Sequence, residues 1–136
     1  MPKKIMQRRT YLKTLLAAGA ATGVAPAQKG AGKGIMLTVD MSVDPAKEKE
    51  MLHNFHTIFK PAAEKTPGYI DVNVYKLRSA VQGSAPAGLN YIFVLLMESE
   101  ELRQKWIHSP THIKVWPTVE KTLTTKNYTV LLFDLA

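Results

Sequence analysis

The side chains best suited to chemistry in this 136-residue sequence are its four histidines, because the chain contains no cysteine. That absence excludes a thiol nucleophile and any metal or iron–sulfur site built on cysteine. A neutral imidazole can take a proton from a phenol or an acidic C–H near pH 7 and return it. We take His112 as the candidate catalytic residue. The alternative is a histidine near a helix end whose ring bonds a backbone carbonyl.

The other three histidines are weaker candidates. His108 lies four residues before His112 and would share a helical face with it, but Ser109-Pro110 between them is expected to break the helix. No carboxylate stands at ligand spacing beside the pair, so we predict no metal site and an exposed His108. His53 and His56 lie off the apolar stripe of their segment, which indicates a solvated face. His56 is nearer to the apolar edge and is a candidate substrate contact.

Two tryptophans are candidates for holding a substrate. Trp106 and Trp116 could line an aromatic cleft between a helix and a sheet, because small-molecule sites are mostly apolar with few polar groups. The alternative is that both are ordinary core residues.

The elements that must position these residues follow from hydrophobic periodicity. Alternation of apolar and polar residues predicts half-buried strands over 35–43 and 69–77, the latter with Ile70, Val72 and Val74 on one side. The almost wholly apolar segment 90–97 predicts a central strand buried on both faces. Residues 79–88 indicate a hairpin loop, and 127–135 form the last predicted strand.

Two helical regions separate these strands. Asp44-Pro45 supplies an N-cap and a first helical residue, Pro61 is expected to kink or interrupt the helix, and Thr66-Pro67-Gly68 ends it. Ser99 caps the second region, which Ser109-Pro110 divides into two pieces.

The resulting order, β-α-β-β-α-β, predicts an α+β fold of the ferredoxin-like type. In this fold both helices cover one face of a four-stranded antiparallel sheet. The other face would be uncovered in a single chain. We therefore expect a homodimer in which two sheets face each other and close an α+β barrel.

The N-terminus has the features of a twin-arginine signal peptide. Arg8-Arg9 is followed by Thr, Tyr, Leu and Lys, and Ala25-Pro26-Ala27 offers small residues to a signal peptidase. The apolar run between them is too short for a stable membrane span. We predict a signal at 1–27, a flexible linker at 28–34 and one domain at 35–136, so that the twin-arginine machinery exports the chain to the periplasm or beyond. A basic amphipathic helix is the alternative.

The positive charge belongs mainly to this predicted signal. The whole chain carries +7, from 18 Lys and Arg against 11 Asp and Glu. Five of the basic residues precede residue 14, which leaves the rest near +2 with no basic patch. A nucleic-acid partner is therefore not expected.

The segments Met97–Trp106 and Ser109–Trp116, with the turn Pro67-Gly68-Tyr69, are similar to the antibiotic biosynthesis monooxygenase family of the dimeric α+β barrel superfamily. The resemblance spans about Ile35 to Leu135. It implies oxygenation of a small aromatic compound, such as a quinol, anthrone or polyphenol, by molecular oxygen without a cofactor. On this resemblance His112 would move the proton, and Trp106 and Trp116 would hold the ring.

The resemblance leaves alternatives. The haem-degrading branch has a histidine ligand ten residues after a tryptophan, but here Trp116 stands ten residues after Trp106. It also has an asparagine on the first strand, and 35–43 contains none. Both departures argue against haem degradation. A non-catalytic dimeric barrel, of the stress-responsive A/B type or one that binds a hydrophobic small molecule, is the second hypothesis.

Overall fold

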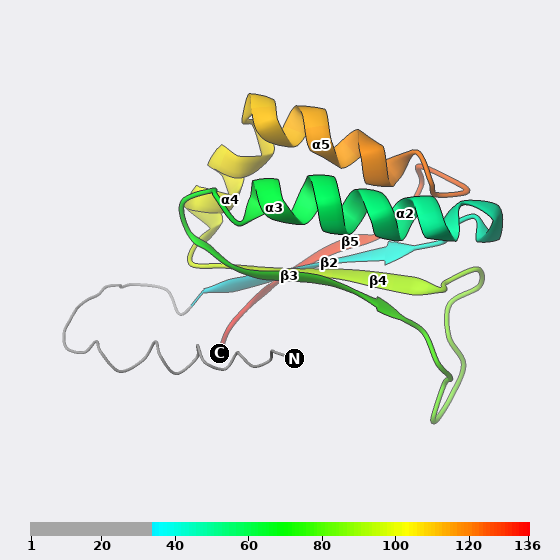
Figure 1. Ribbon diagram of the computed structural model, residues 1–136. Helices are drawn as coiled ribbons and strands as arrows, with labels where there is room; N and C mark the ends of the chain where they lie inside the picture. The colour runs from blue at the N-terminus through cyan, green and yellow to red at the C-terminus, as the bar shows by residue number, and fades with distance from the viewer. Residues whose placement is uncertain (1–33) are drawn as a thin grey trace. The chain divides into compact units, whose positions relative to one another are not determined.

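The computed structural model of the protein describes residues 34–136 (Figure 1). The predicted signal peptide at 1–27 and nearly all of the predicted linker lie outside the described residues. Within the described part, no helix combines the length and the apolar character needed to cross a bilayer.

Four antiparallel strands form one sheet in the order β3-β4-β2-β5. Their bounds are β2 (Ile35–Met41), β3 (Tyr69–Lys76), β4 (Tyr91–Met97) and β5 (Val130–Asp134). The first strand of the domain therefore lies in the middle, between the third and the last, as the ferredoxin-like topology requires.

The helices lie together on one face of this sheet (Figure 1). The first helical region consists of η2 (Pro45–Lys47), α2 (Glu48–Asn54), the π-helical turn η3 (Phe55–Phe59) and α3 (Lys60–Ala63). The second consists of α4 (Glu100–Ile107) and α5 (Pro110–Glu120). The predicted α+β ferredoxin-like fold is confirmed.

The predicted helix starts are confirmed by their capping hydrogen bonds. The Asp44 carboxylate accepts from the Ala46 N–H at 2.9 Å. The Ser99 hydroxyl accepts from the Leu102 N–H at 3.2 Å. Ser109, in the same way, accepts from the N–H of His112 at 3.1 Å. Each cap satisfies a backbone donor that the first helical turn leaves unpaired.

The regular α-helix of the first helical region is interrupted just before Pro61, as expected. The proline ring carries no N–H and would collide with the carbonyl four residues earlier in a regular α-helix. The chain widens to a π-turn just before it, and the Lys60 N–H bonds the Phe55 carbonyl five residues back. The helix therefore continues with a local irregularity, of a kind that is frequent near functional sites.

The strand β4 is central, as predicted, but only one of its faces is fully buried. Tyr91, Phe93, Leu95 and Met97 are buried under the helices, whereas the residues between them are half-buried. The sequence pattern missed this alternation because both sets of residues are apolar. The second apolar face lies on the side of the sheet without helices.

A register shift at the start of β3 corrects another expectation. Ile70 was expected on the same side as the buried Val72, but the ladder is irregular between Tyr69 and Asp71. Tyr69 consequently packs against the core, and Ile70 is 49% exposed. A bulge of this kind exchanges the faces of the residues on either side of it.

Candidate functional site

A cleft opens between the helical layer and the sheet, with a cavity volume of about 150 Å³. Its walls come from β2, β4 and β5 below and from η3, α4 and α5 above. Most of the lining is apolar or aromatic, as is usual for a small-molecule site. The lining residues are Leu37, Val39, Phe59, Phe93, Leu95, Arg103, Trp106, Ile107, His112, Trp116, Tyr128 and Val130.

Aromatic rings packed edge to face form part of the lining of the cleft. The ring centroid of Phe59 lies 6.0 Å from that of Trp106 and 5.8 Å from that of Trp116. Phe93 meets Trp116 at 5.5 Å. These separations are typical of favourable aromatic pairs. Both tryptophans line the cleft. Trp106 is only 2% exposed, so it is at the same time a residue of the hydrophobic core.

His112 enters the same cleft from the first turn of α5. Its ring lies 5.1 Å from Trp106, and it stacks on Trp116 at 6.4 Å with 10° between the planes. Among residues 34–136, no side chain or carbonyl forms a hydrogen bond with either ring nitrogen. Pro110 and the Ser109 cap fix the start of the helix, and so they determine where this side chain projects.

The environment of His112 favours its neutral form. Burial in the cleft lowers the pKa of the imidazole, and the positive charge of Arg103 lowers it further. An uncharged ring is a proton acceptor at neutral pH, with a nitrogen free for a ligand.

The His112 ring does not bond a backbone carbonyl of the described residues, which was the alternative considered for it; the His108 ring does. The Nδ1 atom of His108 lies 2.8 Å from the carbonyl oxygen of Gln104, and the side chain is exposed, as expected. His53 and His56 are exposed as well. His56 is not among the lining residues, and its ring lies against Phe55 instead. The structure thus brings His112, Trp106 and Trp116 together and leaves His56 apart.

Two polar lining residues, Arg103 and Tyr128, were missed by the sequence analysis. Arg103 lies three and four residues before Trp106 and Ile107, a spacing that places all three on one helical face. That spacing was the available signal. Tyr128 lies in the segment before β5, where no periodicity indicates its direction.

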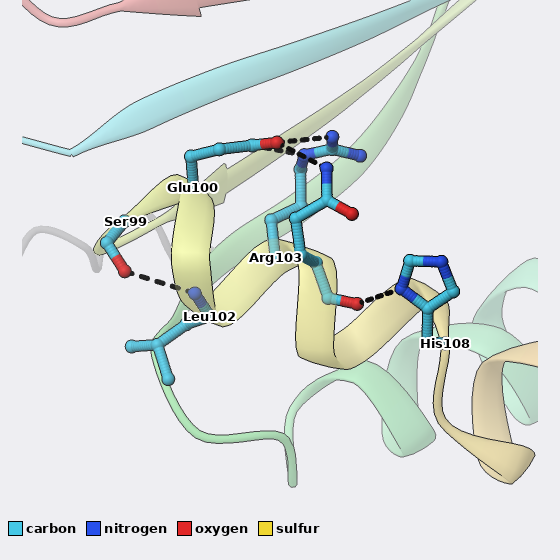
Figure 2. A network of polar contacts seen from close by, with 6 residues as sticks. Ser99, Glu100, Leu102, Arg103 and His108 are labelled. Atoms are coloured by element: carbon cyan, nitrogen blue, oxygen red, sulfur yellow. Dashed lines mark hydrogen bonds and ion pairs between the residues drawn. The ribbon is translucent and has the colours of Figure 1, made fainter.

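Arg103 is held by a network on α4 (Figure 2). Its Nε and Nη2 donate to the two oxygens of Glu100 at 2.6 and 2.8 Å. The Gln104 amide donates to the same carboxylate at 2.7 Å. These hydrogen bonds lower the pKa of Glu100, and the ionised carboxylate holds the guanidinium in a fixed orientation.

Tyr128, the other polar lining residue, contacts Trp116. The Trp116 indole N–H donates to the Tyr128 hydroxyl at 3.2 Å, and that hydroxyl donates to Glu120 at 2.7 Å. Burial, together with the hydrogen bond to Glu120, raises the pKa of the Tyr128 phenol to about 12. Tyr128 is therefore a neutral group that fixes the plane of Trp116.

No group of three or more His, Asp or Glu side chains suited to hold a metal ion occurs within residues 34–136. The chemistry that the described cleft itself offers is that of a neutral imidazole, a guanidinium and a phenol around an apolar space.

Solved structures with a similar fold include one cofactor-independent oxygenase. The chain aligns with SnoaB, a cofactor-independent oxygenase from Streptomyces nogalater, over 74% of this chain and 90% of that one, with a TM-score of 0.56 and 13% identity. A protein from Bordetella bronchiseptica assigned to the antibiotic biosynthesis monooxygenases aligns over 78% and 99%, with a TM-score of 0.61 and 14% identity. The shared fold is ferredoxin-like.

A third solved structure bears on assembly. A dimeric ferredoxin-like protein of unknown function from Jannaschia sp. CCS1 aligns over 76% of this chain and 98% of that one, with a TM-score of 0.58 and 16% identity. No protein-family model and no curated protein matches the sequence. At these identities the likeness establishes the fold, and the function has to be argued from the cleft.

Proposed function

We propose that the protein is a cofactor-independent monooxygenase of a small aromatic compound, with His112 as the catalytic base. The observation that carries the proposal is the neutral imidazole, free of hydrogen bonds within the described residues, in an aromatic cleft. The oxygenases that share the fold support the same reaction class.

A quinol illustrates the chemistry. His112 takes the proton of one hydroxyl, and the resulting phenolate passes an electron to oxygen. The radical pair then joins through a new C–O bond at the adjacent ring carbon, and the imidazolium returns its proton to the peroxide. Cleavage of the O–O bond, with loss of the proton on that carbon, releases water and leaves a carbonyl. One oxygen atom enters the product and the other becomes water, and the substrate itself supplies all four electrons.

The aromatic residues support this chemistry by position. A ring bound in the cleft against Trp106 and Phe59 would lie beside His112, because the His112 ring centroid is 5.1 Å from that of Trp106 and 6.2 Å from that of Phe59. An apolar enclosure also shields the phenolate from protonation by water.

Oxygen uptake tests the proposal most directly. Purified protein is offered a panel of quinols and anthrones, and wild type is compared with H112A. The matched control is H108A, which removes an exposed histidine four residues away. We expect catalysed uptake in wild type and H108A and a loss of at least about 100-fold in H112A, the usual contribution of a general base.

Each other result is informative. Equal uptake in H112A and wild type would support the monooxygenase activity and reject His112 as its catalytic base. Uptake no faster than the buffer rate with every compound would reject the oxygenase and favour the binding protein without catalysis.

We also propose that two copies pair through the sheet face that carries no helices. The register places Met36 opposite Leu96 and Phe133 on that face. It places Val94 opposite Thr38, near the centre. An exposed apolar sheet face of this kind marks an interaction surface, and a protein of the same fold is dimeric.

Light scattering tests the pairing. V94K puts a charge at the centre of the face and is expected to give the monomer mass, whereas wild type gives the dimer mass. The control is V81K, at a loop position that is 97% exposed. A wild-type monomer mass would reject the dimer.

Export through the twin-arginine machinery is the third part of the proposal, and it rests on the sequence motif. The full chain expressed in a bacterium is expected in the periplasmic fraction. Replacing Arg8 and Arg9 together by lysine should retain it in the cytoplasm. Equal export of both forms would reject the signal.

A further inference from the structure

The lining of the cleft contains a cation as well as the base. Arg103 lines the cleft together with His112, and its side chain is only 13% exposed. The guanidinium of a largely buried arginine side chain favours contact with an anion.

Glu100 does not use the whole guanidinium. Its two oxygens bond Nε and Nη2, and Nη1 forms no hydrogen bond with any residue of 34–136. Figure 2 shows one guanidinium nitrogen directed away from the carboxylate. Since Arg carries five N–H donors in a fixed fork, donors remain for a ligand.

Arg103 belongs to the lining of the cleft, but its ion-pair partner Glu100 does not. The Glu100 side chain is 40% exposed, against 13% for Arg103, so water screens the carboxylate more than the guanidinium. Gln104 draws further on the carboxylate through its own hydrogen bond. Arg103 thus lines the cleft, and its counter-ion is the more exposed partner and is not among the lining residues.

The size of the cleft limits the ligand. An apolar cavity of about 150 Å³ is large enough for one benzene-sized ring, which matches the cavity volume of this cleft. The apolar walls contribute no second cation to the lining.

We infer that the cleft selects a single aromatic ring bearing an anionic oxygen, with Arg103 as the residue that binds that oxygen and so determines specificity. This inference rests on the proposed function for its view of the cleft as a substrate site. It narrows the substrate from aromatic compounds in general to acidic ones.

The anion also bears on orientation. An oxygen held by Arg103 fixes one end of the ring, and Trp106, one helical turn further along α4, contacts its face. The reacting hydroxyl is then presented to His112 on the adjoining helix.

Calorimetric titration of the full chain with benzoate and benzamide tests the inference. The two probes have nearly the same shape and differ in charge. We expect wild type to bind benzoate at least tenfold more tightly than benzamide, R103M to lose that preference, and R103K to retain part of it. R78M is the matched control, because Arg78 is the other arginine of the described residues and is exposed.

A second variant guards against misfolding of R103M. E100Q keeps the guanidinium and removes its counter-ion, so benzoate should bind several-fold more tightly than to wild type while benzamide is unchanged. Equal binding of the two probes by wild type, binding of neither, or a benzoate preference that survives in R103M would overturn the inference.

These results are separable from those of the oxygen assay. Arg103-dependent binding of benzoate in a protein without oxygen uptake would leave the acidic-ring site in place and reject the oxygenase. Oxygen uptake with neutral quinols, combined with equal binding of the two probes, would support the oxygenase and reject the acidic-ring site.

Discussion

Gly68 joins the first helical region to β3, and its substitution by alanine should destabilise the protein through a specific collision. Its φ is +86°, and a Cβ built there would lie 2.6 Å from Cδ1 and 3.0 Å from Cβ of Leu102. The Gly68 carbonyl also accepts the N–H of Glu98 at 2.8 Å, which holds the turn against the end of β4. The turn thus supports α4, the helix that carries Arg103 and Trp106.

The magnitude has two parts. A side chain in the left-handed region costs about 1–2 kcal/mol, and overpacking a filled site costs about 1–3 kcal/mol. We therefore expect G68A to lower the free energy of unfolding by about 2–5 kcal/mol. Gly83 is a matched control, because its φ is +71° and an added Cβ meets nothing within 4 Å.

Urea unfolding of the two variants isolates the collision. Both lose the same flexibility of the unfolded chain, so their difference of about 1–3 kcal/mol reports the contact with Leu102. The double variant G68A/L102A should cost less than the sum of the single changes. If G68A and G83A agree within about 0.5 kcal/mol, the proposed packing of the turn against α4 is wrong.

Three further predictions follow from hydrogen bonds and charge. The pKa of His112 is lowered in the folded state, so between this lowered pKa and the ordinary value of 6.5 the unfolded chain binds more protons than the folded chain. The contribution of His112 to the free energy of unfolding therefore rises with pH across this window. Urea midpoints measured against pH should show this rise in wild type and in H108Q, and H112Q should remove it. Y128F removes the hydroxyl that accepts the Trp116 indole N–H. It should lower the free energy of unfolding by about 1–2 kcal/mol and change the tryptophan fluorescence spectrum, and an unchanged spectrum would contradict this hydrogen bond. The Asn90 side chain accepts a hydrogen bond from the Val43 N–H and donates one to the Val43 carbonyl, both at 2.8 Å. N90A should therefore lower the free energy of unfolding by about 2–3 kcal/mol. A loss below about 0.5 kcal/mol in urea unfolding would refute this pair of hydrogen bonds.

The fold followed from local patterns that survive without tertiary information. Period-2 alternation located the strands, and the side-chain oxygens of Ser99 and Ser109 marked helix starts, because each cap bonds a backbone N–H only three residues away. The patterns failed where two local signals were equivalent. The strand β4 is apolar on both faces, and the bulge at Tyr69 leaves no trace in composition.

The candidate site was only partly within reach of the sequence. His112, Trp106 and Trp116 could be selected by residue type and by family resemblance, and all three line one cleft. Residue type alone could not separate His112 from His56. That distinction depends on which side of the helical layer each ring occupies, and His56 is exposed.

The sequence by itself determined the α+β class, the order of the elements and the presence of one sheet face that no helix covers. These features depend on periodicity and capping within a few residues. Only the tertiary structure decided that Arg103 and Tyr128 share a cleft with His112. The chain brings Tyr128 to Trp116 across a turn, and it brings Arg103 to the same space from a separate helix. Such meetings depend on the packing of helices against a sheet, which no local pattern records.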